Sequence, residues 1–468
     1  MGKRTFILLS ALLAMIGFAV SCKGEPSPSQ SENILHMVTF DTSGGSAVPS
    51  QIVKNGGNAV KPADPTRENF VFVEWQKDGV AFDFSDTITE DITLKANWKE
   101  SQLQETYTIA MITDYGEDIT DKSFNQITYE ACKAYAETQG LQFKYYKPAN
   151  STADRIAMIE QAIGEDFNII VMPGYAFAEA IVQIAPQNKD VKFIALDVAL
   201  DDLLDAVVGA AYDYNPANWN LADYVDLSNA YCIVYQEEIA GYLAGYATVS
   251  LGYTELGFCG GMAVPAVVRY GYGFVQGAEA AAAKLGKTGT IQYAYANQFF
   301  GDADITAAMD AMYKNGAQVV FACGGGVFTS VSEAAVKVNG KVVGVDVDQK
   351  PIIDGLYGAD LTVTSAMKGL YASTQATLKL IVEDNAWDTV AGKIGNLGLV
   401  SGTDVESNFV GIPMEGTEWS DSFTKADYTA LVNDIYTGKI VISNDTTVSV
   451  DTFAGALAVK DLGNIISR

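Results

Sequence analysis

The sequence predicts two α/β lobes that face each other across a cleft, preceded by a small β-rich module. From residue 106 onward, strand-like apolar runs alternate with amphipathic stretches, which is typical of parallel sheets covered by helices on both faces. The alternation is too long for one sheet and restarts after a break at about residues 212–230. Residues 34–100 instead show short alternating runs separated by glycine and proline, which favours a separate β unit.

The composition is that of a folded, acidic protein. Of the 468 residues, 49% are hydrophobic and 11% are aromatic, which is enough for a sizeable core. The formal net charge of −27 at pH 7 repels phosphate backbones, so no nucleic-acid partner is expected.

The residues that most often carry catalysis are scarce. The only histidine, His36, precedes the α/β lobes, which excludes Ser-His-Asp or Cys-His catalysis and histidine-ligated metal sites there. The five cysteines form no CxxC pair, and Cys132, Cys232, Cys259 and Cys323 are expected to be buried free thiols. Carboxylate pairs could support glycoside hydrolysis, but no spacing singles out such a pair. We therefore expect no enzyme, no metal site and no cofactor.

The amino terminus has the pattern of a secretory signal. Lys3 and Arg4 precede the apolar run Phe6–Val20, which is too short for a comfortable membrane span. Cys22 ends a segment that resembles a bacterial lipobox, in which the cysteine is lipidated; an ordinary cleaved signal followed by a stray cysteine is the alternative. We expect residues 1–22 to be a lipoprotein signal peptide and residues 23–33 a disordered tether. The protein would then be extracytoplasmic and lipid-anchored to the cell membrane.

The pattern of residues 34–100 predicts a β module, and none of its residues indicates a catalytic or ligand-binding role. The phrases VTFDTSGGSAVPSQIVKNGG, KPADPTRENFVFVEWQKDG and ITEDITLKANW closely resemble the internalin-type B repeat of bacterial surface proteins, a small β-grasp unit. This resemblance implies that Trp75 and Trp98 are core residues. A single copy would act as a spacer or as a weakly adhesive surface.

The larger domain, residues 106–468, shows the β-then-α alternation most clearly. Helices are predicted over Ser123–Thr138, Asp302–Asn315 and Val327–Val338. The apolar runs that predict strands end at Thr113, Lys147, Met172, Asp197, Phe258, Ala294, Ala322 and Val345.

The segment Asp121-Lys122-Ser123-Phe124-Asn125 is the strongest candidate for a ligand contact. It lies between the strand-like run that ends at Thr113 and the following helix, which is where open α/β sheets place ligands. A phenylalanine flanked by Asp, Ser and Asn offers a stacking face beside hydrogen-bonding groups, which suits an aromatic, polar small molecule. The alternative is a plain helix start, capped by Ser123 or Asp121, with Phe124 packed inward.

Asp346 and Lys368 form a second candidate. Asp346 ends one strand-like run, and Lys368 follows the run 361–364, just before a helical stretch. If these strands are neighbours in one parallel sheet, their carboxyl ends open on the same cleft edge. An acceptor and a donor there could grip a vicinal diol, or the two could merely pair at the surface. The glycines at 260–261 and 324–326 follow strands without a phosphate-loop pattern. They predict either close backbone approach to a ligand or tight turns.

Six segments, in order, are similar to the basic membrane protein family of substrate-binding lipoproteins, which includes bacterial purine nucleoside receptors. The segments are TDKSFNQ (120–126), VYQEEIAGYLAGY (234–246), GFCGGMAVPAVVRYGYGFVQG (257–277), VVFACGGG (319–326), GVDVDQ (344–349) and TSAMKG (364–369). The resemblance implies the type I periplasmic-binding-protein fold, two Rossmann-like lobes joined by a hinge. It also implies a nucleoside ligand, with a purine as the first candidate, and delivery to an ABC permease.

Carried over by position, the resemblance implies six ligand-binding residues. Phe124 matches the residue that stacks on the base, and Asn125 and Asp114 lie beside it. Asp346 matches the aspartate that binds ribose hydroxyls, Lys368 is its lysine partner, and Asp197 corresponds to an acid that faces the base. Phe299, Phe300, Tyr270 and Tyr272 are the candidates for the second aromatic wall, although an aromatic residue in such a position is more often part of the core than of a site.

The chain also departs from the family pattern. Ala263 stands where an aspartate is common, the AAGGTG-like loop appears as Ala322–Val327, and the aromatic stretch Tyr212–Trp219 looks inserted. Since some relatives bind other ligands, including flavins, a receptor for riboflavin or a sugar is one alternative. A surface adhesin that uses the β module is another. A nucleoside hydrolase would need an acidic metal cluster, and no DxDxxxDD-like run occurs.

Overall fold

The computed structural model describes residues 34–67, 70–100, 107–114, 119–120, 122–358 and 360–465. The predicted signal peptide with Cys22, the predicted tether at 23–33 and Asp121 lie outside these residues. The chain divides into two compact units, Met1–Thr106 and Tyr107–Arg468. Among the described residues, no helix is both long enough and apolar enough to cross a bilayer.

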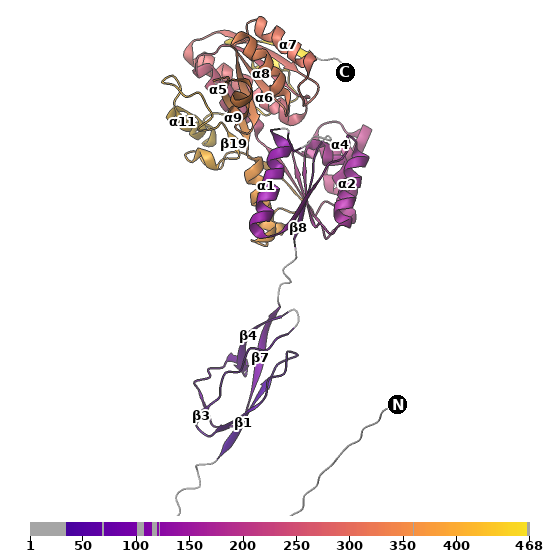
Figure 1. Cartoon of the computed structure of the whole chain (residues 1–468), viewed down its shortest axis with the longest axis vertical. Coiled ribbons are helices and arrows are strands. Elements are labelled where there is room, and N and C mark those ends of the chain that lie inside the picture. Colours follow the sequence, from indigo (N-terminus) through magenta and orange to yellow (C-terminus); the bar gives the residue numbers. More distant parts are fainter. Residues whose placement is uncertain are drawn as a thin grey trace, which may run out of the picture. The chain divides into compact units, whose positions relative to one another are not determined.

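The described part of the first unit is built from strands (Figure 1). Five strands form one sheet in the order β2-β1-β7-β4-β5, with β1 and β7 parallel and the other neighbours antiparallel. Trp75 is fully buried in the core, whereas Trp98 is half-buried and its Nε1 donates a hydrogen bond to the Thr42 carbonyl (2.9 Å). The predicted β-rich module is therefore confirmed. Its strands are β1 (Leu35–Asp41), β2 (Gln51–Lys54), β3 (Gly57–Asn58), β4 (Phe70–Lys77), β5 (Val80–Ala81), β6 (Thr87–Ile88) and β7 (Ile92–Glu100), with β3 and β6 pairing separately.

The first lobe of the second unit is a six-stranded parallel sheet in the order β18-β12-β11-β10-β8-β9. Alternate side chains of its strands pack against α1 on one face and against α2 and α3 on the other. Strands covered on both faces need continuous apolar runs, and all five residues of β10 are buried. The elements are β8 (Thr108–Ile112), α1 (Phe124–Gln139), β9 (Gln142–Tyr146), α2 (Thr152–Gly164), β10 (Ile169–Pro173), α3 (Ala178–Ile184), β11 (Lys192–Leu196), α4 (Leu200–Val208), β12 (Ala230–Tyr235), α10 (Leu370–Val382) and β18 (Lys393–Leu397).

The second lobe is a seven-stranded sheet in the order β19-β17-β16-β15-β13-β14-β20, in which only the β17–β19 pair is antiparallel. Helices α5 and α6 cover one face, and α7, α8 and α9 cover the other. The elements are α5 (Glu237–Ser250), β13 (Glu255–Gly260), α6 (Pro265–Leu285), β14 (Gly289–Tyr295), α7 (Ala303–Lys314), β15 (Val319–Cys323), α8 (Val327–Val338), β16 (Lys341–Asp346), α9 (Lys350–Tyr357), β17 (Thr362–Lys368), β19 (Val410–Gly411), α11 (Lys425–Tyr436) and β20 (Leu457–Asn464).

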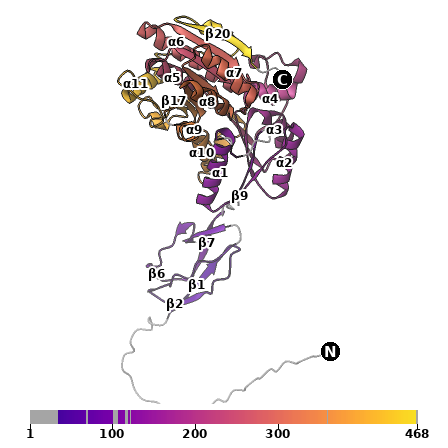
Figure 2. The same cartoon turned by 45° about the horizontal axis from the view of Figure 1, so that its top comes forward.

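Within the described residues, the chain crosses between the lobes three times. It leaves the first lobe at Gln236, between β12 and α5, and returns at Gly369, where β17 leads into α10. Helix α10 lies beside α1 (Figure 2), and Gln375 Nε2 donates a hydrogen bond to the Ala131 carbonyl (2.7 Å). The third crossing joins β18 to β19.

The first crossing corrects one expectation. The break at about residues 212–230 does not separate the lobes, because β12 follows it and still pairs with β11 in the first sheet. The segment holds 3-10 turns, and its aromatic rings, Tyr212, Tyr214, Trp219 and Tyr224, contact one another.

Candidate ligand-binding site

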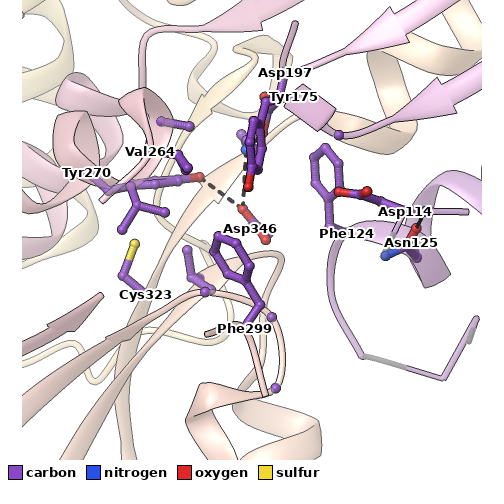
Figure 3. Close-up of a pocket in the computed structure, with 18 residues that line it drawn as sticks. Asp114, Phe124, Asn125, Tyr175, Asp197, Val264, Tyr270, Phe299, Cys323 and Asp346 are labelled. Carbon is purple, nitrogen blue, oxygen red and sulfur yellow. Dashed lines mark hydrogen bonds and ion pairs between the residues drawn. The ribbon is translucent and has the colours of Figure 1, made fainter. Parts of the chain in front are cut away.

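The carboxyl ends of several strands meet at a cavity between the two lobes. Its volume is about 100 Å³, and its lining includes all six residues that the sequence predicts as ligand contacts (Figure 3). Asp114 and Asp197 follow β8 and β11 of the first lobe, and Phe124 and Asn125 open α1. Asp346 and Lys368 are the last residues of β16 and β17. The structure therefore brings the predicted residues together; their role in binding stays a prediction.

Two of the aspartates have an unusual backbone conformation. Asp197 has a φ of 58° and Asp346 a φ of 65°, in the left-handed region that few residues other than glycine adopt. Strained backbone of this kind concentrates at ligand sites. In both cases, the turn after the strand lies at the cavity.

Lys368 is the centre of the charge in the cavity. Its Nζ lies 2.5 Å from Asp197 Oδ2, 3.7 Å from Asp346 Oδ1 and 3.6 Å from Glu237 Oε1. Burial alone would lower the pKa of Lys368, but the three carboxylates outweigh it and hold that pKa above its ordinary value. The ammonium group therefore stays charged at neutral pH.

Asp346 accepts one hydrogen bond across the cleft and one from within its own lobe. Ser123 Oγ of the first lobe donates to Asp346 Oδ2 of the second (2.6 Å), and Tyr270 hydroxyl donates to Asp346 Oδ1 (3.4 Å). Ser123 does occupy the position before α1, yet it makes no side-chain capping hydrogen bond. The simple capping interpretation of this motif is therefore wrong for Ser123, whose hydroxyl reaches the opposite lobe.

Aromatic side chains from both lobes reach the space around Asp346. Phe124 is half-buried with its ring lining the cavity, and Phe299 lies on the second-lobe side (Figure 3). A Cβ added to Gly261 would lie 2.4 Å from the Phe299 ring, and one added to Gly324 would lie 3.0 Å from it. These two glycines therefore make room for the Phe299 side chain. The sequence had predicted either close approach of the backbone to a ligand or tight turns at these glycines, and neither interpretation includes this role.

The other predicted aromatic candidates divide into two groups. Tyr270 is buried and lines the cavity as Phe299 does. Phe300 is exposed, and Tyr272 packs against Tyr293 and Phe453 away from the cavity. Of the four candidates for the second aromatic wall, only Phe299 and Tyr270 line the cavity.

The amide and guanidinium groups near Asp114 fix the first-lobe wall. The Asp114 backbone N–H donates to Asn125 Oδ1 (2.9 Å), and Arg155 Nη2 donates to Asp114 Oδ1 (3.2 Å). Because Arg155 is itself buried, the position of Asp114 is set before any ligand arrives.

The loop that departs from the family pattern contributes to the cavity wall. Cys323 lies in this wall, and burial raises the pKa of the thiol well above its ordinary value. All four cysteines predicted to be buried free thiols are buried and unpaired. Within the described ranges, no group of three or more His, Cys, Asp or Glu side chains could hold a metal ion.

Sequence reasoning missed two charged residues beside the site. Glu237 begins α5, and Arg269 lies on α6; Arg269 Nε donates to Glu237 Oε2 (2.7 Å). Both lie within segments that carry the family resemblance, but an acid at a helix start is usually explained by the helix dipole. The only available signal was the apolar run on both sides of the Glu237-Glu238 pair.

Stability should fall as the pH rises through the range in which Glu238 titrates. Burial raises the pKa of this carboxyl from 4.5 to about 7. A raised carboxyl pKa means that the folded state binds the proton more tightly, so the stabilisation is complete below pH 4.5 and is lost towards pH 7. We expect Glu238→Gln to remove on the order of 2 kcal/mol of this pH dependence, measured by urea unfolding. If the free energy of unfolding depended equally on pH in the natural protein and in Glu238→Gln, the raised pKa of Glu238 would be contradicted.

The comparisons with known proteins agree with this geometry. Residues 108–415 match the family described as ABC transporter substrate-binding protein PnrA-like, and residues 36–97 match the Listeria-Bacteroides repeat domain. A Listeria innocua protein named CD4+ T-cell-stimulating antigen is 26% identical over 352 residues, 72% of this chain and 86% of the relative. The ABC transporter nucleoside-binding protein BmpA of Lactococcus lactis subsp. cremoris is 25% identical over 347 residues, 71% of this chain and 88% of the relative.

A solved structure supports the fold. An ABC transporter solute-binding protein from Conexibacter woesei superposes with a TM-score of 0.54 at 20% identity, covering 72% of this chain and 99% of that chain. The predicted two-lobed periplasmic-binding-protein fold is thereby confirmed. The chain therefore belongs to the PnrA-like family of ABC transporter substrate-binding proteins, an extracytoplasmic family, and carries a Listeria-Bacteroides repeat ahead of its substrate-binding domain.

Proposed function

We propose that this protein binds a nucleoside, with a purine as the first candidate, between its two lobes and delivers it to an ABC permease. One observation carries the proposal: Phe124, Asp346 and Lys368, far apart in sequence, line one interlobe cavity. A relative named as nucleoside-binding supports the choice of ligand class.

The site suits a heterocycle joined to a sugar. The base stacks against Phe124 and faces Phe299, and the sugar hydroxyls donate to Asp346 and accept from Lys368. The cavity of about 100 Å³ is smaller than a nucleoside requires, so the lobes separate to admit the ligand and close on it. A permease can then distinguish the closed form from the open one. The protein binds and releases its ligand without chemical change.

The sugar should be essential for affinity. A free base leaves Asp346 and Lys368 without their ligand hydrogen bonds, each of which costs about 1–3 kcal/mol when unmade. We therefore expect inosine, guanosine or adenosine to bind at least about 10-fold more tightly than the matching base, since 1.4 kcal/mol is a factor of ten. Calorimetric titration of each pair measures this difference.

The same titration series distinguishes the rival ligands. Riboflavin and simple sugars belong in the panel, because the clamp recognises hydroxyl groups and the aromatic wall tolerates other rings. Tight binding of riboflavin or a sugar, with no response to any nucleoside, would replace the proposed ligand. Incubation with a nucleoside that releases free base would instead indicate a hydrolase.

We also propose that Cys22 anchors the protein to the membrane by its acyl chains. The proposal is supported by the amino-terminal sequence pattern. Mass spectrometry of the peptide that contains residue 22, isolated from membranes, tests this anchor. An adhesive role for the β module is tested separately, by measuring the matrix binding of the full chain with and without saturating nucleoside.

A further inference from the structure

Glu237 is a buried carboxylate that the proposed binding scheme does not use. Its side chain has no exposed surface, and it is the first residue of α5, directly after the chain leaves the first lobe at Gln236. Lys368 is 4% exposed and ends β17, directly before the chain returns at Gly369. The 3.6 Å contact between Lys368 Nζ and Glu237 Oε1 therefore joins two of the three interlobe crossings.

Glu237 is itself held from the opposite side. Arg269 Nε donates to Glu237 Oε2 (2.7 Å) from α6, the helix that packs along α5. The two helices approach so closely that a Cβ on Gly273 of α6 would lie 2.1 Å from the Glu238 carbonyl. The carboxylate of Glu237 is thus fixed by a rigid helix pair, and Lys368 contacts it from a separate segment.

The crossings are also bonded to one another along the backbone. The Gln236 N–H donates to the Leu397 carbonyl (2.9 Å), and the Gly369 N–H donates to the Phe409 carbonyl (2.7 Å). Because Gly369 directly follows Lys368, hydrogen exchange of the Gly369 amide reports on the backbone next to Lys368. If the side chain of Lys368 loses its position, the hydrogen bond between the Gly369 amide and the Phe409 carbonyl should break more often, and the amide should exchange faster.

We propose that Glu237 is a positioning residue that fixes the ammonium group of Lys368 at the hinge, for the ligand that Lys368 contacts. This inference rests on the proposed function for the role of Lys368. When sugar hydroxyls donate hydrogen bonds to Asp346, that carboxylate attracts the ammonium group of Lys368 less strongly. Glu237 then keeps Lys368 in place, because no ligand reaches a carboxylate that is fully buried behind it. The hinge and the sugar clamp thereby share one ion pair.

The first test needs no ligand. Glu237→Gln removes the charge and keeps the shape, and Glu238→Gln is the matched control, because Glu238 is a buried neighbour that makes no ion pair among the described residues. At pH 6 Glu238, with its pKa of about 7, is mostly protonated, so its replacement changes little. Hydrogen exchange of the Gly369 amide should accelerate about tenfold in Glu237→Gln, as expected for a coupling near 1.4 kcal/mol. Equal exchange in the two variants would overturn the inference.

The second test is a double-mutant cycle on inosine affinity with Lys368→Met. Glu237→Gln should weaken binding about tenfold in the natural protein and have no effect, or a favourable one, when Lys368 is absent. Additive losses would show that Glu237 acts through general structure and would refute the positioning role. If Lys368→Met does not fold, Glu237→Asp replaces it: the shorter carboxylate should restore part of the affinity that Gln loses, and no recovery would count against the inference. If no nucleoside binds the natural protein, the proposed function fails, while the Gly369 exchange result still decides whether Glu237 positions Lys368.

Discussion

Replacing Asp346 by alanine is expected to lower the affinity for a nucleoside by about 100-fold or more, because hydrogen bonds to a charged acceptor contribute about 1.5–3 kcal/mol each. Asp346 is buried and accepts a hydrogen bond from Ser123 of the opposite lobe, and its Oδ1 lies 3.7 Å from Lys368 Nζ. Its removal therefore takes away both the sugar acceptor and a bond that holds the lobes together. Calorimetric titration at constant pH measures the loss.

The matched control is Asp310→Ala. Asp310 lies on the second lobe as Asp346 does, but it is partly exposed, and among the residues that the structure describes its one ion-pair partner is Lys337. Such a surface pair contributes roughly 0–1 kcal/mol to stability, so binding should be unchanged. If Asp346→Ala bound the nucleoside as tightly as Asp310→Ala, Asp346 would not be the sugar-binding residue. Lys368 retains Asp197 and Glu237 in the variant, so the fold should persist.

Replacing Gly277 by valine is expected to prevent the second lobe from folding. A Cβ at Gly277 would lie 1.9 Å from the Tyr242 carbonyl oxygen, where backbone rather than a movable side chain is in the way. A Cβ added to Gly241 or Gly245 of α5 would likewise lie 2.1 Å from a backbone carbonyl oxygen of α6. Since the two helices cannot separate without emptying the core between them, even alanine should cost on the order of 3–5 kcal/mol. Urea unfolding and the yield of folded protein measure the effect.

Gly164→Ala provides the control for helix propensity. Gly164 ends α2, and a Cβ there would meet no atom within 4 Å. This substitution should be neutral or stabilising by about 0.4–1 kcal/mol, because it restricts the unfolded chain. A Gly277→Ala protein as stable as Gly164→Ala would show that α5 and α6 can move apart.

The sequence predicted most strand ends well, and with them which residues would meet at the cavity, for a definite physical reason. Parallel strands buried on both faces leave long apolar runs, and the predicted ends Thr113, Met172 and Val345 fall within one residue of the ends of β8, β10 and β16. Helix α8 begins and ends where the apolar pattern predicts, at Val327 and Val338. Asp197 directly follows β11 and Asp346 ends β16, so locating the strand ends also placed these two cavity residues.

Features that depend on distant parts of the chain could not be predicted in this way. Strand β18 pairs with β12 after most of the second lobe has intervened in the sequence. Of its five residues, Ile394 and Leu397 pack against the core clusters. The apolar runs therefore predict no strand there. The ion pair between Glu237 and Lys368 joins two separate crossings, and no local periodicity records which crossings will meet.

The return of the chain to the first lobe has a consequence for biogenesis. The sheet of that lobe is incomplete until β18 is synthesised, and α10, which lies beside α1, is also made after β17. A nascent chain that ends anywhere before this point lacks an edge strand and a covering helix, so it cannot bury its apolar faces. In an extracytoplasmic family, we expect this late completion of the amino-terminal lobe to delay its folding during synthesis, which would favour export of an unfolded chain.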